Sequence, residues 1–310
     1  WGLIFPGEPA KAATFARRAA SVSHDGEAIY GAQVVASLVS AAFVESDIET
    51  LLETALETIP PDCTVRKLID DVREWHLREP DWRETLAKIH AEYGYDKYRG
   101  QCHLIPNHAL IILSLLYGDG DFDESMKIVN TAGWDTDCNS GNVGAILGVR
   151  NGLQGLQNQD WRGPVADRLY LPSADPGRSI TDAVRESFAI INTARQLRKL
   201  DPIAPKDGAR FHFTFPGSVQ GFLCRTPESG RVTHSQTVDP EAEPGLLMIH
   251  EQGSAARFTT PTFIPPDTKD MVTGYVLVAC PTVYSGHRVE AKLRAGLQGC
   301  LGRFTLGHYN

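Results

Sequence analysis

Two aspartates separated by one residue, Asp135 and Asp137, lie in the segment GWDTDCNSG at residues 133–141, between two strongly apolar segments. At this spacing in a turn, both carboxylates can point to one hard cation such as Mg²⁺ or Ca²⁺. The structural alternative is that Asp137 or Asn139 caps the helix that follows, with Gly133 ending the helix before it. For an isolated pair of aspartates capping is the commoner role, so the spacing alone leaves both interpretations open.

An EF-hand calcium loop is excluded by the residues that follow. Asp135, Asp137 and Asn139 match its first, third and fifth positions. The sixth position needs glycine and holds Ser140, and the twelfth needs a bidentate glutamate and holds Ile146. A metal at this loop would therefore belong to another kind of site.

The bulk composition is that of a globular protein without a polyanionic partner. A length of 310 residues favours about two domains. The net charge is −8 and no run of Lys or Arg occurs, which argues against binding to a nucleic-acid backbone or an anionic membrane surface. The longest apolar run, residues 32–44, is too short to cross a bilayer and predicts a buried helix.

The six cysteines are scattered, with no CxxC spacing, at positions 63, 102, 138, 224, 280 and 300. This pattern fits free thiols in a reducing compartment better than a disulfide framework, so a cytoplasmic location is the default expectation. The sequence opens at Trp1 in an apolar stretch without an initiator Met or a signal-peptide pattern. We therefore expect an internal piece of a longer polypeptide.

Apolar residues recur at helical spacing from Pro9 to about Leu200, which predicts an all-α domain over residues 1–203. The predicted helices cover residues 9–23, 26–43, 46–59, 65–77, 81–95, 106–118, 122–134, 142–153 and 181–200. Ser46 and Glu49 have the spacing of a capping box, and Asp81 precedes its helix as a cap.

Polar residues at other predicted helix starts have ordinary structural interpretations. Asp25 and Glu27 suit the first turn of their own helix, where carboxylates complement the helix dipole. Asn107 follows Pro106 at a helix start, which favours a cap. Trp134 could stack on a sugar or base, although burial is the commoner fate of an aromatic side chain.

Beyond residues 201–208 the pattern changes to short segments of period two, separated by turns rich in Pro and Gly. The predicted strands lie in residues 210–215, 245–251, 256–263, 274–280, 287–293 and 302–309. The chain is thus predicted to be a multi-domain α and β protein, with the helical domain followed by a β-sandwich-like domain at residues 204–310.

Three stretches resemble the ADP-ribosylglycohydrolase family in the same order along the chain. They are SHDGEAIYGAQ at 23–33, CHLIPNHALIILSLLYGDGDFDESMKIVNTAGWDTD at 102–137, and GWDTDCNSGNVGAILG at 133–148. The resemblance covers about residues 1–200. The β-rich part resembles sandwich domains appended to some larger members.

The resemblance implies hydrolysis at the anomeric carbon of an ADP-ribosyl group, with a pair of Mg²⁺ ions, or Mn²⁺ in their place, as cofactor. Asp135 and Asp137 would be the catalytic and metal-binding residues, and Ser23 with His24 would lie beside the bound ribose. On its own, His24 ahead of a helix is more often a capping or surface histidine.

Two departures from the family pattern stand out. Many members have a coordinating Thr after the second aspartate, where this chain has Cys138, a soft ligand that suits Mg²⁺ poorly, so Asn139 is a further candidate ligand. The second metal half-site of the family, a Thr-Asp-Asp-type motif, is expected upstream of Trp1. A binuclear site needs both halves.

Two other functions therefore stay open. One keeps the fold and metals but acts on a nucleoside or carbohydrate, which the β-rich domain favours. The other is a non-catalytic binding protein, which Cys138 and the missing half-site favour. The oligomeric state is open as well.

Overall fold

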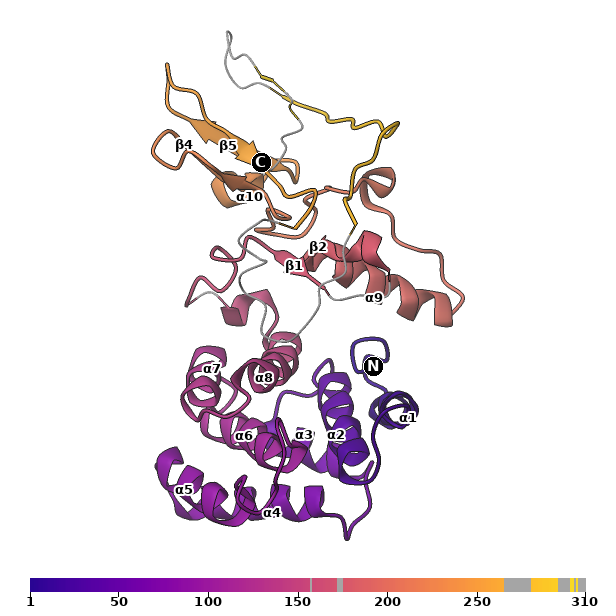
Figure 1. The fold of residues 1–310 in the computed structure, drawn as a ribbon, viewed down its shortest axis with the longest axis vertical. Helices are drawn as coiled ribbons and strands as arrows, with labels where there is room; N and C mark the ends of the chain where they lie inside the picture. The colour runs from indigo at the N-terminus through magenta and orange to yellow at the C-terminus, as the bar shows by residue number, and fades with distance from the viewer. Residues whose placement is uncertain (157, 172–174, 265–279, 295–301, 304, 306–310) are drawn as a thin grey trace. The chain divides into compact units, whose positions relative to one another are not determined.

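A computed structural model describes residues 1–156, 158–171, 175–264, 280–294, 302–303 and 305 (Figure 1). The chain divides into two compact units. The helical unit comprises residues 1–161 and 190–201, and the second unit comprises residues 162–189 and 202–310.

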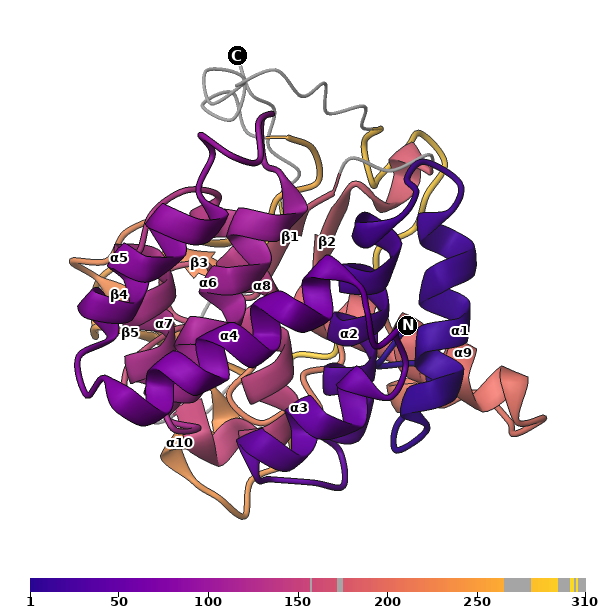
Figure 2. The ribbon, with the colours of Figure 1, turned by 90° about the horizontal axis from the view of Figure 1, so that it is seen from below.

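The helical unit is built from α1 (Pro9–Ala20), α2 (Glu27–Ala41), α3 (Ile48–Leu56), α4 (Thr64–Arg78), α5 (Trp82–Tyr93), α6 (Leu104–Tyr117), α7 (Phe122–Thr131), α8 (Thr136–Asn151) and a 3-10 turn at Leu153–Leu156. The central element is α6, which packs on α2, α3, α4, α5, α7 and α8. In Figure 1, α4 and α5 lie on one side of α6, and α7 and α8 lie on the other; α1 runs beside α2 (Figure 2). The mostly helical character predicted for residues 1–203 is confirmed, but the region is not all-α, because residues 168–170 and 180–182 form strands.

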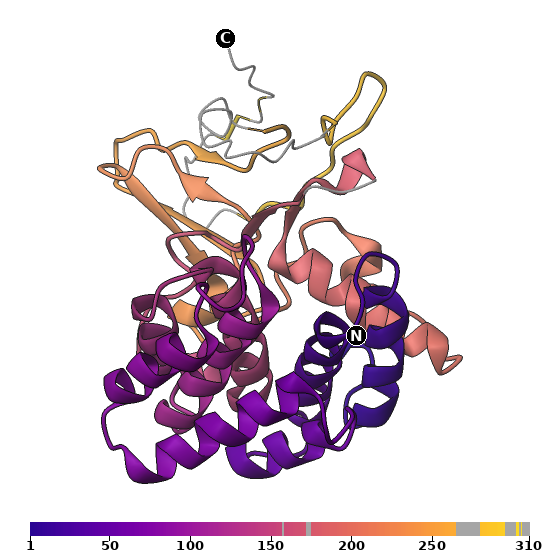
Figure 3. The same cartoon turned by 60° about the horizontal axis from the view of Figure 1, so that its bottom comes forward.

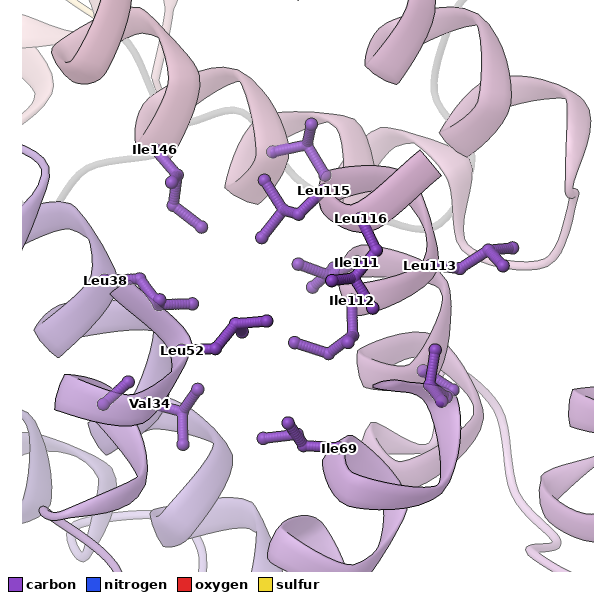
Figure 4. Packing of buried hydrophobic residues seen from close by; sticks show 14 of the residues in the cluster. Val34, Leu38, Leu52, Ile69, Ile111, Ile112, Leu113, Leu115, Leu116 and Ile146 are labelled. Carbon is purple, nitrogen blue, oxygen red and sulfur yellow. The ribbon is translucent and has the colours of Figure 1, made fainter. Parts of the chain in front are cut away.

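The core of this unit is aliphatic. Figure 4 shows Leu38 of α2, Leu52 of α3 and Ile146 of α8 directed toward Ile112 and Leu115 of α6. All five side chains are at most 1% exposed. Since burying one such side chain contributes about 1.5–3 kcal/mol, this cluster fixes where each helix lies. No helix among the described residues combines the length and the apolar character that a membrane span requires.

Two of the predicted helix caps can be compared with the caps in the structure. Asp81 caps α5 by accepting a hydrogen bond from the Arg83 N–H, as predicted. The Ser46 capping box is wrong, because α3 begins one residue later with Asp47 as its cap. The carboxylate of Glu45 accepts the N–H groups of Ser46 and Asp47, which holds both residues outside the helix.

The second unit contains β1 (Arg168–Tyr170), β2 (Ile180–Asp182), β3 (Leu223–Cys224), β4 (Gly230–His234), β5 (Leu246–His250), β6 (Phe258–Thr259), the short helix α10 (Ser235–Val238) and 3-10 turns at Pro176–Arg178 and Pro205–Gly208. Helix α9 (Ala183–Leu197) contributes residues to both units. The strands form three separate antiparallel pairs, β1 with β2, β3 with β6, and β4 with β5. The β4–β5 pair, in register from Gly230 opposite His250 to His234 opposite Leu246, is visible as an orange ribbon in Figure 3.

The predicted β-sandwich is not shown in the described part of the chain. The predicted strands at 245–251 and 256–263 contain β5 and β6. Residues 210–215 and 287–293 are irregular. In the first of these segments Gln220 Oε1 accepts the N–H groups of His212 and Phe213, which a neighbouring strand would otherwise take up. The predicted strands at 274–280 and 302–309 lie almost entirely outside the described residues.

Candidate metal site at the start of helix α8

The site is formed by a two-residue reversal between α7 and α8. Gly133 and Trp134 both have left-handed backbone angles, with φ of 86° and 57°. Glycine adopts this conformation freely. In a bulky L-residue such as Trp134 the same conformation costs about 1–2 kcal/mol of free energy. The reversal lets α8 begin at Thr136, six residues earlier than the sequence predicted.

The capping interpretation of the aspartates is wrong. Asp135, not Asp137 or Asn139, takes the N-cap position of α8, and its side chain makes no capping hydrogen bond. Asp137 lies in the first turn of the helix, and Asn139 follows in the next turn. Both carboxylates therefore lie at the start of α8, where the helix dipole favours negative charge.

Asp135, Asp137 and Cys138 each offer a ligand atom, and these three atoms lie within 4.8 Å of one another. In the part of the chain that the structure describes, this is the one group of three or more His, Cys, Asp or Glu residues spaced for a metal ion. A hydrogen bond with Asp135, followed by the N–H groups of Asp137 and Cys138, lowers the pKa of Asp137.

The loop is fastened by a buried side chain of α6. Asn107 Oδ1 accepts hydrogen bonds from the Asp135 N–H at 3.1 Å and from Asn139 Nδ2 at 3.0 Å. Asn107 Nδ2 donates to the hydroxyl of Tyr95 and to the carbonyl of His103. Asn107 was expected to cap its helix; His103 is the cap instead, so Asn107 is free to bind the start of α8.

Asn139 is 1% exposed, and its amide is committed to Asn107. What the structure gives for Asn139 is thus a contact that fixes the loop. Its predicted role as a metal ligand stays a prediction.

An aromatic group supports the same loop. The half-buried Trp134 ring stacks on His90, with ring centroids 4.6 Å apart, and meets Tyr95 edge to face at 5.3 Å. These contacts offset the backbone strain at Trp134. Stacking of Trp134 on a substrate stays a prediction, since the contacts seen are with protein rings.

Ser23 and His24 lie in the exposed turn ahead of α2, with Ser23 Oγ 2.8 Å from His24 Nδ1. Within the described residues, no hydrogen bond or ion pair joins them to the two aspartates. The first turns of α2 nevertheless pack at the start of α6, because a Cβ at Gly31 would come within 2.6 Å of the Leu104 side chain. Asn107 lies one turn further along α6, so the starts of α2, α6 and α8 meet at one end of the bundle.

Glu27 does more than complement its own helix. Its two carboxylate oxygens accept the N–H groups of Thr64 and Val65, each at 2.9 Å, at the start of α4. Glu27 therefore caps a different helix from the one that the sequence suggested.

Two thiols adjoin the carboxylates. Partial desolvation, a hydrogen bond to Asp135 and the charges of both aspartates raise the pKa of the Cys138 thiol to about 11. Desolvation, the charge of Asp135 and a hydrogen bond to that carboxylate raise the pKa of the Cys102 thiol as well. Sequence reasoning missed Cys102 as a neighbour of this site, although it opens the 102–137 stretch that resembles the family.

The donor set fits a divalent cation in part. Two carboxylates at the start of one helix suit Mg²⁺, which binds through one or two carboxylates and keeps several waters. The thiol of Cys138 is a soft donor and adds little to a site for Mg²⁺.

A model of the ADP-ribosylglycohydrolase family matches residues 1–196, and the chain belongs to this family. The match includes all three stretches that carried the resemblance, which is therefore confirmed. The family acts as hydrolases on ADP-ribosyl bonds, so its members take ADP-ribosylated substrates. Searches of curated proteins and of solved structures gave no match.

Proposed function

We propose that this chain is a Mg²⁺-dependent hydrolase that cleaves the anomeric bond of an ADP-ribosyl group, with Mn²⁺ able to replace Mg²⁺. The observation that carries the proposal is the pair of carboxylates on Asp135 and Asp137. Their ligand oxygens lie within 4.8 Å of each other, and the Asp135 side chain makes no capping hydrogen bond to α8. Membership in a family of ADP-ribosyl hydrolases supports it.

In this mechanism Asp135 and Asp137 would hold the cation. A divalent cation bound there would polarise water and the ribose hydroxyls. Asn107 holds the Asp135 backbone in place, so the Asp135 carboxylate keeps its position while the bound substrate reacts. As the glycosidic bond breaks, positive charge develops at the anomeric carbon, and a nearby carboxylate stabilises it.

The remaining substrate contacts follow from the helix starts. Backbone N–H groups at a helix start bind phosphate, which gives the pyrophosphate a site in a chain of net charge −8. Ser23 and His24 contact the ribose, and Trp134 stacks on the sugar or base.

The proposed cofactor is a pair of cations, of which this loop holds one. Turnover is therefore measured on residues 1–310 with a panel of ADP-ribosylated, nucleoside and glycosidic substrates. Mg²⁺-dependent release of ADP-ribose supports the proposal, and exclusive turnover of another member of the panel assigns a different substrate.

Asp137→Ala should abolish metal-dependent hydrolysis, because it removes one of the two carboxylates that hold the cation. The matched control is Asp62→Asn, a change at an exposed aspartate in the turn ahead of α4, which should keep full activity. Turnover retained by Asp137→Ala would refute the assignment.

A non-catalytic binding role competes with hydrolysis, and one observation favours it: a thiol stands where many members have a coordinating hydroxyl. The same assays distinguish the two roles, since a binding protein would bind an ADP-ribosylated substrate without releasing product.

A further inference from the structure

A cavity of about 210 Å³ lies in the helical unit, where α2 packs against α1 and α3 (Figure 2). On the α1 side it is lined mainly by apolar residues, among them Pro9 and Ala13. On the side of α2 and the end of α3 the lining is polar and includes Gln33, Thr54, Glu57 and Thr58. The cavity shares no residue with the candidate metal site at α8.

The side chain of Gln33 contains a buried acceptor without a donor. Gln33 is 7% exposed, and its Nε2 donates to the Thr58 carbonyl at 2.8 Å. Because a carbonyl only accepts, this bond fixes which end of the amide is nitrogen and directs Oε1 away from Thr58. Among the described residues Gln33 Oε1 has no hydrogen-bond partner. A buried polar atom in this state points to a bound group that donates to it.

The threonine hydroxyls of the cavity have already given up their protons. Each donates to a backbone carbonyl three or four residues earlier, at 2.7–2.9 Å: Thr14 to Ala10, Thr54 to Thr50, and Thr58 to Ala55. A hydroxyl that donates in this way still has lone pairs to offer. The hydroxyls and the Gln33 oxygen therefore call for a ligand that brings hydrogen-bond donors.

The charge at the cavity is negative. Glu57 is exposed and forms no ion pair in the part of the chain that the structure describes. The Arg66 guanidinium reaches the end of α3 but is bound to the Leu56 carbonyl and to Asp70 instead. A ligand with N–H donors and a positive charge complements both the acceptors and this carboxylate.

We propose that the cavity binds a small primary alkylammonium ion. Its ammonium group donates to Gln33 Oε1 and to the threonine oxygens, Glu57 balances its charge, and its alkyl chain packs on Pro9 and Ala13. The volume of about 210 Å³ lies below the range of about 300–1,000 Å³ that drug-sized ligands occupy, so the site suits a chain of a few carbon atoms. Binding here is independent of the proposed function.

The test is a calorimetric titration of residues 1–310 at neutral pH with n-butylammonium chloride and with tetramethylammonium chloride, a cation that has no N–H group. The variants are Gln33→Leu, which removes the buried acceptor, and Glu57→Gln, a change at an exposed side chain. The matched control is Glu84→Gln, at an exposed glutamate in the first turn of α5. Asp137→Asn reports any amine that binds at the acidic start of α8 instead.

The wild type, Glu84→Gln and Asp137→Asn should bind n-butylammonium with equal affinity. Tetramethylammonium should bind at least about tenfold more weakly, because it cannot donate to Gln33 Oε1. Gln33→Leu should reduce the n-butylammonium affinity by about tenfold or more, and Glu57→Gln by about threefold, since its charge is screened by solvent. Far-UV circular dichroism checks that Gln33→Leu is folded; if it is not, Glu57→Gln and the comparison of the two cations decide.

A wild type that does not bind n-butylammonium overturns the site, and so does equal affinity in the wild type and Glu57→Gln. Equal affinity for the two cations overturns the role of the buried acceptor. Binding that is lost in Asp137→Asn places the amine at α8 and overturns the cavity site. Amine binding in a chain that neither binds Mg²⁺ nor hydrolyses ADP-ribosyl bonds supports the site and contradicts the proposed function.

Discussion

The two units of this chain differ in the kind of side chain that stabilises the interior of each. The helical unit surrounds α6 with aliphatic side chains, among them Leu110 and Ile112, which are 0% exposed. The second unit has few buried apolar side chains among its described residues, and it buries polar groups that include Asp182 and Gln220, each 1% exposed. Apolar burial tolerates small errors in position, whereas each buried polar group must find its partner.

The polar network of the second unit joins segments that are distant in sequence. Asp167 Oδ2 accepts hydrogen bonds from Ser218 Oγ and from the N–H groups of Val219 and Gln220. Asp182 pairs with Arg210 and accepts a hydrogen bond from Gln220. In the helical unit a comparable bridge, Asn107 to Asn139, occurs where the candidate metal site lies. Buried polarity thus supports the fold of the second unit, and in the helical unit one such bridge also fixes the candidate site.

The largest effect is expected from Asp182→Ala in the second unit. It leaves Arg210 and Gln220 without their buried partner, which costs about 3–5 kcal/mol. Hydrogen–deuterium exchange should show faster exchange across β4 and β5. All five tryptophans lie in the helical unit, so their fluorescence follows that unit separately. Glu241→Ala, at an exposed residue, is the control, and unchanged exchange in Asp182→Ala would contradict the comparison.

A smaller effect is expected from pH in the helical unit. Burial lowers the pKa of His108 to about 4, against an ordinary value of 6.5. The unfolded chain therefore takes up a proton that the folded chain does not. The stability is complete above pH 6.5 and is lost as the pH falls toward 4, by about 2 kcal/mol between pH 7 and pH 5.

Urea unfolding followed by tryptophan fluorescence at the two pH values checks this expectation. His108→Gln should remove most of the pH dependence, whereas His24→Gln, at an exposed histidine, should keep it. Equal pH dependence in His108→Gln and the wild type would assign the effect to other groups.

Asn107→Ala should reduce the Mg²⁺ affinity by about 10- to 100-fold, because Asp135 and Asn139 lose the group that positions them. Tyr95→Phe is the matched variant, since it removes a contact of Asn107 Nδ2 and leaves Oδ1 in place. It should have a much smaller effect. Equal losses in the two variants would show that general destabilisation, rather than loop position, sets the affinity.

Much of the helical unit could be predicted because hydrophobic periodicity reports directly on an apolar core. The start of α8 could not, because it depends on the left-handed angle of Trp134, which no periodicity encodes. Asn107 was mistaken for a cap because its partners, Asp135 and Asn139, are about thirty residues away. Cys102 was missed for the same reason.

The second unit was harder to predict for a related cause. The period-two pattern at 210–215 is real, but Gln220 takes the N–H groups that a strand would offer to its neighbour. Where single side chains replace ladder hydrogen bonds, alternation of apolar and polar residues no longer identifies a strand.

The central claim is that the start of α8 holds a divalent cation, and calorimetric titration with Mg²⁺ tests it most directly. The wild type and the Asp62→Asn control should bind Mg²⁺ with equal affinity, and Asp137→Asn should lose that binding, because a neutral amide replaces one of the two carboxylates. Mg²⁺ binding of equal strength in all three proteins would contradict the account.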